Sequence, residues 1–96
     1  MTYSVVIVED EVEVAQLLAQ YLLLPHGVAG QQGARQTLRQ GQYQVVGIAG
    51  NLVTAKALLS AINADLILLD IHLPDGNGLD LLNELRREEM KSEVML

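Results

Sequence analysis

The fold is decided by residues 65–78, whose sequence is DLILLDIHLPDGNG. An unbroken apolar run lies between two aspartates, Asp65 and Asp70, and a proline and two glycines follow soon after. An apolar run of this length between polar residues predicts a strand that is buried on both faces of a parallel sheet. Asp70 then lies at the carboxyl edge of that sheet, where open α/β folds place their chemistry.

Length and composition favour a single small domain and exclude several classes of protein. The chain has 96 residues, half of them apolar, with a formal net charge of −6 and no cysteine. The lack of cysteine excludes a disulfide framework and fits a reducing cytoplasm. No apolar run approaches the ~20 residues of a membrane helix. We therefore expect a cytoplasmic domain that binds no membrane and, through this segment, no nucleic acid.

Strand-like and helix-like patterns alternate along the chain. Short apolar runs predict strands at residues 3–8, 43–49 and 65–70, with the opening of a fourth at 94–96. Amphipathic spacing predicts helices at residues 11–24, at 52–62 and from Asn77 or Gly78 onward, and Asn51 is a good N-cap for the second of them. In the last helix we expect Leu79, Leu82 and Leu85 to face the core. This order predicts an α/β fold with a doubly wound parallel sheet.

Residues 25–42 interrupt this pattern. Pro25 ends the first predicted helix, and glycine and glutamine dominate the segment that follows. We interpret residues 25–42 as a Gly/Gln-rich insertion between the first helix and the second strand, and we assign it no chemistry.

Acidic residues follow two of the predicted strands. Glu9 and Asp10 come directly after the first strand, and Asp70 ends the third. Parallel strands end at the same edge, so adjacent strands would bring these carboxylates together. At about 4 Å and an effective dielectric near 20, each ionised pair costs about 4 kcal/mol, which a Mg²⁺ ion held by oxygens would relieve. Taken singly, the first two could instead be charges at a helix N-terminus, and Asp70 could cap a local turn.

Two motifs carry a resemblance to a known family. Residues 5–11, VVIVEDE, and residues 65–82 resemble the receiver domain of bacterial two-component response regulators. VVGIAGN at 45–51 and DGNG at 75–78 are similar to regulators of the citrate- and dicarboxylate-sensing type. The resemblance implies a flavodoxin-like sheet of strand order 2-1-3-4-5, present here only through the start of strand 4. It also implies that residues 1–96 form a receiver domain that is incomplete at its C-terminus.

The resemblance implies a role for each acidic residue. Asp70 matches the residue that accepts a phosphoryl group from the phosphohistidine of a sensor histidine kinase. Glu9 and Asp10 match the acidic pair that holds Mg²⁺, Asp10 directly and Glu9 through water. The backbone carbonyl of His72 would be a further ligand, whereas its side chain has no part. Such a domain is not itself an enzyme and controls an output, commonly a DNA-binding domain in a longer parent chain.

The chain also departs from the family pattern. The family has a Ser or Thr after strand 4 and a Lys after strand 5, and neither is present, since the only lysines, Lys56 and Lys91, match neither position. We therefore expect either a fragment of a longer regulator or an interaction module that pairs with a second copy as a homodimer. Two other sites are disfavoured. His72 stands where an aspartyl phosphohydrolase has a second Asp, and Glu-Asp-Glu replaces the glycine loop of a dinucleotide site.

Overall fold

A four-stranded parallel sheet with helices on both faces forms the core of the chain. The computed structural model describes residues 2–22, 42–88 and 92–96. The order of the strands in the sheet is β2-β1-β3-β6, which confirms the predicted doubly wound topology. The strands are β1 (Thr2–Val8), β2 (Gln42–Ala49), β3 (Leu66–Leu69) and β6 (Glu93–Met95), and the helices are α1 (Val12–Leu22), α2 (Leu52–Ala61) and α3 (Gly78–Arg87).

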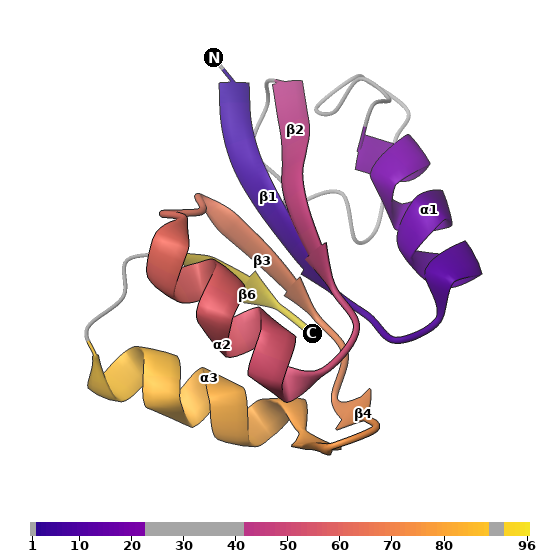
Figure 1. The fold of residues 1–96 in the computed structure, drawn as a ribbon. Helices are drawn as coiled ribbons and strands as arrows, with labels where there is room; N and C mark the ends of the chain where they lie inside the picture. The colour runs from indigo at the N-terminus through magenta and orange to yellow at the C-terminus, as the bar shows by residue number, and fades with distance from the viewer. Residues whose placement is uncertain (1, 23–41, 89–91) are drawn as a thin grey trace.

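The helices cover the sheet from opposite sides. Figure 1 shows α1 on one side and α2 and α3 on the other. The central strand β1 divides its side chains between the two layers, because successive residues of a strand point to opposite faces. Val5 and Ile7 pack with α1, whereas Val6 and Val8 pack with α2 and α3. All four are at most 1% exposed, so the centre of the sheet is dry.

A bulge in β2 changes which of its residues face each layer. Tyr43 and Val45 pair with Tyr3 and Val5 of β1, but the next pair is Gly47 with Val6, so Val46 is the extra residue. A bulge of one residue shifts the alternation of the strand. Tyr43 therefore packs on the α1 side, whereas Ala49 packs on the α2 side.

The predicted inward face of α3 is partly wrong. Leu81 and Leu85 are buried at 1% and 6% exposure, and Leu82 packs partly against the same cluster. Leu79, which we expected in the core, is 39% exposed. The reason is the start of the helix: Gly78 is buried against the backbone of Asp70, and this contact turns residues 78, 81 and 85 toward the sheet.

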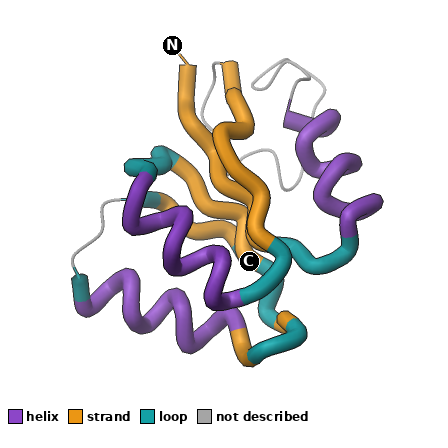
Figure 2. Tube along the Cα trace, viewed as in Figure 1, coloured by secondary structure: helices purple, strands orange, loops and turns teal. Residues whose placement is uncertain are grey.

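Several predictions from sequence concern the connections. Asn51 caps α2, because its side chain accepts a hydrogen bond from the Thr54 N–H at 2.8 Å. The loop after Asp70 contains a two-residue antiparallel pair that we did not predict, β4 (His72–Leu73) and β5 (Gly76–Asn77), drawn as short strand segments in Figure 2. The predicted insertion lies outside the described residues except for Gln42, which begins β2.

Among the described residues, no helix is both long and apolar enough to cross a membrane.

The contact at Gly78 predicts a large effect of a small substitution. A Cβ at this position would overlap the carbonyl oxygen of Asp70, and backbone cannot move aside as a side chain can. We expect Gly78→Ala to lower the free energy of unfolding by about 1–3 kcal/mol, as overpacking does. Urea unfolding followed by circular dichroism measures it.

Gly50→Ala is the matched control. A Cβ at Gly50 would meet nothing nearer than the Asp10 Cα at 3.9 Å and the Glu9 carbonyl oxygen at 4.0 Å. We expect this variant to stay within about 0.5 kcal/mol of the wild type. Equal losses in both variants would refute the argument from the Gly78 contact.

Candidate functional site

The candidate site lies where β1 and β3 end side by side. Val8 and Leu69, the last residues of these strands, are partners in the parallel ladder. One residue further, the Asp70 N–H donates to the Val8 carbonyl at 2.9 Å. On the other side of β1, the Glu9 N–H donates to the Ala49 carbonyl of β2 at 2.9 Å. The three loops that leave this edge are therefore joined through the backbone.

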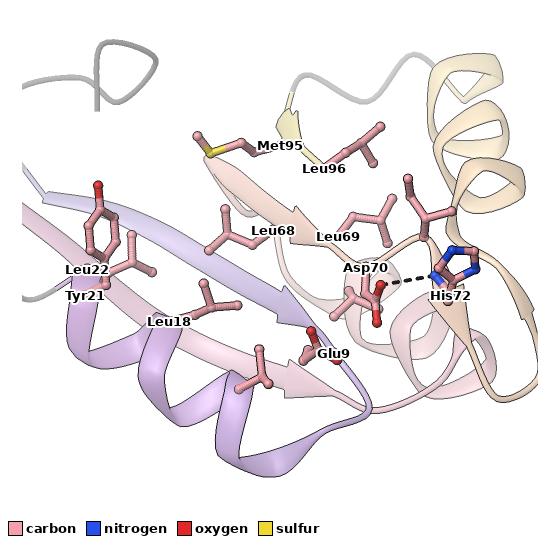
Figure 3. Close-up of a pocket in the computed structure, with 13 residues that line it drawn as sticks. Glu9, Leu18, Tyr21, Leu22, Leu68, Leu69, Asp70, His72, Met95 and Leu96 are labelled. Atoms are coloured by element: carbon pink, nitrogen blue, oxygen red, sulfur yellow. Dashed lines mark hydrogen bonds between the residues drawn. The ribbon is translucent and has the colours of Figure 1, made fainter. Parts of the chain in front are cut away.

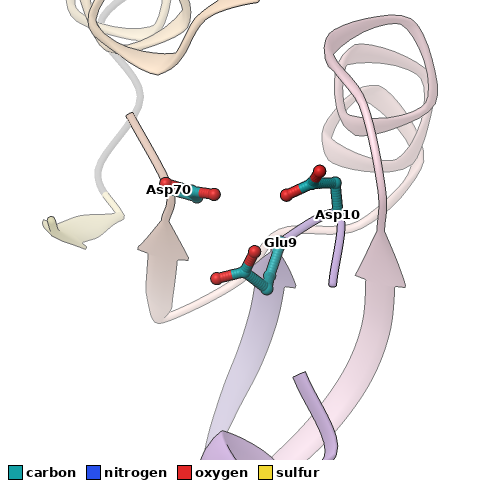
Figure 4. Close-up of side chains that lie close together, drawn as sticks. All are labelled: Glu9, Asp10 and Asp70. Atoms are coloured by element: carbon teal, nitrogen blue, oxygen red, sulfur yellow. The ribbon is translucent and has the colours of Figure 1, made fainter. Parts of the chain in front are cut away.

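This arrangement brings the three predicted acidic residues together. Carboxylate oxygens of Glu9, Asp10 and Asp70 all lie within 4.8 Å of one another. Figure 4 shows the three side chains pointing into a common space, with Asp70 arriving from β3 and the other two from the end of β1. Glu9 and Asp70 are half-buried, and Asp10 is exposed. Such a group of oxygens suits a hard divalent cation.

The electrostatics of the cluster are most evident at Glu9. Burial raises the pKa of its carboxyl above the ordinary value of 4.5, and Asp70 and Asp10 raise it further through hydrogen bonding and, for Asp70, charge repulsion. The Glu11 N–H, which donates to Glu9 Oε2 at 3.2 Å, acts in the opposite direction. In the metal-free cluster the Glu9 carboxyl therefore favours its neutral form more than a free glutamate does.

Two hydrogen bonds order the loop after Asp70, one to the Asp70 side chain and one within the loop. The His72 N–H donates to Asp70 Oδ1 at 3.1 Å, and the Gly78 N–H donates to the Ile71 carbonyl at 2.7 Å. The side chain of His72 is exposed. Its backbone carbonyl as a metal ligand stays a prediction.

Asp75 is a residue of this loop whose contacts the sequence did not reveal. Its Oδ1 accepts from the Leu52 N–H at 2.7 Å and its Oδ2 from the Val53 N–H at 3.1 Å. The hydrogen bond from Leu52 is the main reason why the pKa of Asp75 lies below its ordinary value. A Pro-Asp-Gly sequence is typical of a turn, and nothing in it indicates a contact with α2.

An apolar hollow of about 690 Å³ adjoins the cluster. Figure 3 shows Glu9, Asp70 and His72 at one end and apolar side chains from α1, β3 and β6 along the rest, among them Leu18, Leu68 and Met95. The hollow lies on the α1 side of the sheet, opposite α2 and α3.

Lys56 lies outside the cluster and has a structural contact. Its Nζ lies 3.1 Å from Glu84 Oε1, an ion pair that joins α2 to α3. Lys91 falls outside the described residues.

Comparisons with known proteins agree on the family. The family model of the response regulator receiver domain matches residues 28–96. The transcriptional regulatory protein MalR of Bacillus subtilis is 36% identical over 93 residues, which are 97% of this chain and 33% of that protein. DpiA of Escherichia coli K12, also a transcriptional regulatory protein, is 32% identical over 92 residues, 96% of this chain and 34% of that protein. The chain thus spans about a third of the length of these curated relatives.

Solved structures give the same result. The MaeR response regulator bound to beryllium trifluoride superimposes with a TM-score of 0.75 and 32% identity, covering 100% of this chain and 66% of that one. A DNA-binding response regulator of the LuxR family from Staphylococcus aureus shares the fold, with a TM-score of 0.74 at 24% identity over 96% of this chain and 64% of that one. The relatives support the expected likeness to the citrate- and dicarboxylate-sensing type. With a matching family model, this fold and this strand order, the chain belongs to the receiver domains of two-component response regulators.

Proposed function

We propose that the chain is a phosphoacceptor signalling domain in which Asp70 takes a phosphoryl group from the phosphohistidine of a sensor histidine kinase. The observation that carries this proposal is the cluster of Glu9, Asp10 and Asp70, whose carboxylate oxygens lie within 4.8 Å at the carboxyl edge of the sheet. Three carboxylates at this distance repel one another in the resting protein. They become useful when a cation and a phosphoryl group share the space between them.

The donor set fits Mg²⁺. It consists of carboxylate oxygens at an edge of the sheet where Asp10 is exposed, and such open sites leave room for the waters that Mg²⁺ keeps. Asp10 and Asp70 would bind the ion directly, Glu9 through water, and the His72 carbonyl would complete the protein ligands. Bound there, Mg²⁺ supplies neutralisation of the charge between Asp70 and the phosphoryl oxygens.

The residues of the chain then have separate tasks in the transfer. An oxygen of Asp70 attacks phosphorus as the bond from phosphorus to the kinase histidine nitrogen breaks, which leaves an acyl phosphate on Asp70. The histidine leaves as a neutral imidazole when its other ring nitrogen carries a proton. The His72 N–H, bonded to Asp70 Oδ1, holds the carboxylate in a fixed orientation for this attack. Phosphoryl transfer depends mainly on such positioning and on charge stabilisation.

The wider role follows from the relatives and is part of the proposal. MalR and DpiA are transcriptional regulatory proteins about three times as long as the match, so this domain would control a transcriptional output in the cytoplasm. Its own segment would contact the kinase and leave nucleic acid to an output domain.

Phosphorylation is directly testable. Incubation of the chain with acetyl phosphate and Mg²⁺ is expected to add the mass of one phosphoryl group, and Asp70→Asn is expected to remove this adduct, because an amide is no nucleophile toward phosphorus. Intact-mass spectrometry measures both, and a chelator should abolish the wild-type adduct.

The matched control is Asp80→Asn, which removes an exposed carboxylate from the first turn of α3. This variant should be phosphorylated like the wild type. If the wild type acquires no Mg²⁺-dependent adduct, the proposed function is wrong; an adduct that survives in Asp70→Asn would place the acceptor elsewhere.

The like charges predict that Mg²⁺ reverses the order of stability of the wild type and the Asp70→Asn variant. Without divalent cations at neutral pH, Asp70→Asn should unfold at a higher temperature than the wild type, because one of three repelling carboxylates is gone. With Mg²⁺ at about 100 times its Kd, the wild type should gain about 2.7 kcal/mol and the variant much less. Thermal unfolding with and without Mg²⁺ measures this, and the same order in both conditions would count against the metal site.

The raised pKa of Glu9 gives the pH dependence of the metal-free protein. A carboxyl whose pKa is raised in the fold contributes stability below its ordinary value of 4.5 and loses it as pH rises through the raised pKa. We expect Glu9→Gln to remove this loss, so that its unfolding temperature falls less than that of the wild type between pH 4.5 and neutrality.

A second candidate function is an interaction module that dimerises without phosphorylation. The observation in its favour is β6, which pairs only with β3 among the described strands and so forms an edge of the sheet. Light scattering at increasing concentration separates the two candidates: the module requires a dimer without acetyl phosphate, and a stable monomer would exclude it.

A further inference from the structure

The three loops at the site are joined by two kinds of contact. Backbone hydrogen bonds join the first loop to β2 and the third loop to β1, through Glu9 to Ala49 and Asp70 to Val8. The third loop is joined to the start of α2 by a side chain, Asp75. This contact closes a ring that runs from Glu9 through β2 and the start of α2 to Asp75, then back along the loop to Asp70.

In the contact between Asp75 and α2, two carboxylate oxygens match two N–H groups that the helix leaves without a partner of its own. Helix α2 has no acidic residue in its own first turn, and its capping residue Asn51 satisfies only the Thr54 N–H. The N–H groups of Leu52 and Val53 remain, and the two carboxylate oxygens of Asp75 accept one each. Asp75 thus completes the N-terminus of α2 from 22 or 23 residues away and places a negative charge where the helix dipole favours it.

The next residue, Gly76, shows that the loop lies tightly against this helix. Its φ of +154° is one that other residues rarely adopt, and a Cβ there would lie 2.5 Å from Leu52 Cδ1. Leu52 therefore contacts the loop twice, through its N–H at Asp75 and through its side chain at Gly76.

The loop that Asp75 holds carries the groups that face the phosphoacceptor. His72 lies between Asp70 and Asp75, and its N–H bonds Asp70 Oδ1. The Gly78 N–H donates to the Ile71 carbonyl, and β4 pairs with β5, so the loop that contains His72 is closed on itself. Leu73 anchors the loop to the core, and Asp75 adds the hydrogen bonds that tie it to the start of α2.

We propose that Asp75 is a positioning residue for the phosphoryl-accepting site: by binding the first two N–H groups of α2, it fixes the loop that presents the His72 backbone to Asp70 and to the metal. This inference rests on the proposed function and deepens it. The groups that Asp75 positions are the His72 N–H, which orients the nucleophile, and the His72 carbonyl, which would bind Mg²⁺.

The test compares two substitutions at one position. Asp75→Ala removes both acceptors, whereas Asp75→Asn removes the charge but keeps one carbonyl oxygen for the Leu52 or Val53 N–H. The rate of adduct formation with acetyl phosphate is measured against Mg²⁺ concentration, at a temperature where circular dichroism shows every variant folded. We expect the Mg²⁺ concentration at half-maximal rate to rise about tenfold in Asp75→Ala, as for other groups that orient metal ligands, and less in Asp75→Asn.

Asp80→Asn serves as the control for lost charge and should match the wild type. A wild-type Mg²⁺ dependence in Asp75→Ala would overturn the inference while the proposed function stands, even if the unfolding temperature falls. An equal rise of the half-maximal Mg²⁺ concentration in Asp75→Asn and Asp80→Asn would also overturn it, because the loss of any nearby negative charge would then explain the effect. If Asp75→Ala does not fold, the Mg²⁺ dependence of Asp75→Asn is compared with those of the wild type and Asp80→Asn instead: a rise supports the inference, and a wild-type value overturns it. Failure of the wild type itself to form an adduct overturns the proposed function, and this inference with it.

Discussion

The in-register pairing of β1 with β3 is the constraint on which the rest of the site depends. Val8 and Leu69 end their strands at the same level, and the Asp70 N–H continues the ladder to Val8. This pairing alone determines that the residue after β3 lies beside the residues after β1. It is stabilised by the dry centre of the sheet, since Val5 to Val8 are at most 1% exposed. Shifting the register by one residue would move Asp70 along the strand direction by about 3.3 Å relative to Glu9 and Asp10.

That constraint explains how the chain tolerates an unfavourable group of charges. Glu9, Asp10 and Asp70 repel one another, and burial adds to the raised pKa of Glu9. The repulsion lowers the stability of the fold at the carboxyl edge of the sheet. The apolar burial that compensates for it lies along the strands, on both faces of β1. A fold whose core is independent of its site can hold charges that would otherwise move apart. A cation bound between like charges relieves such repulsion, and this is the physical basis of the proposed metal site.

The predictions from sequence succeeded where the cause was local or followed from topology. Apolar runs and a capping Asn51 predicted the strands and the start of α2, and the order of elements predicted which acids converge. They failed where the cause lay in tertiary contact. Leu81 rather than Leu79 faces the core because Gly78 lies against the Asp70 backbone. The bulge at Val46 changes the facing of β2, and its one sign in the sequence is the adjacent Gly47, since a glycine inside a strand often accompanies a bulge. The partners of Asp75, the Leu52 and Val53 N–H groups, are 23 and 22 residues away at the start of α2, so no local pattern could indicate them.

The two kinds of contact at the site differ in how they depend on sequence. Backbone ladders join the end of β1 to both β2 and β3, and they persist for any residues that keep these strands buried. The distance between the acidic pair and Asp70 is therefore a property of the fold. The position of the loop after Asp70 depends more on particular side chains: Leu73 is buried in the core, the Asp75 carboxylate binds the start of α2, and Gly76 leaves room for Leu52. Substitutions in this loop can therefore alter the surroundings of Asp70 while leaving the fold and its three carboxylates in place.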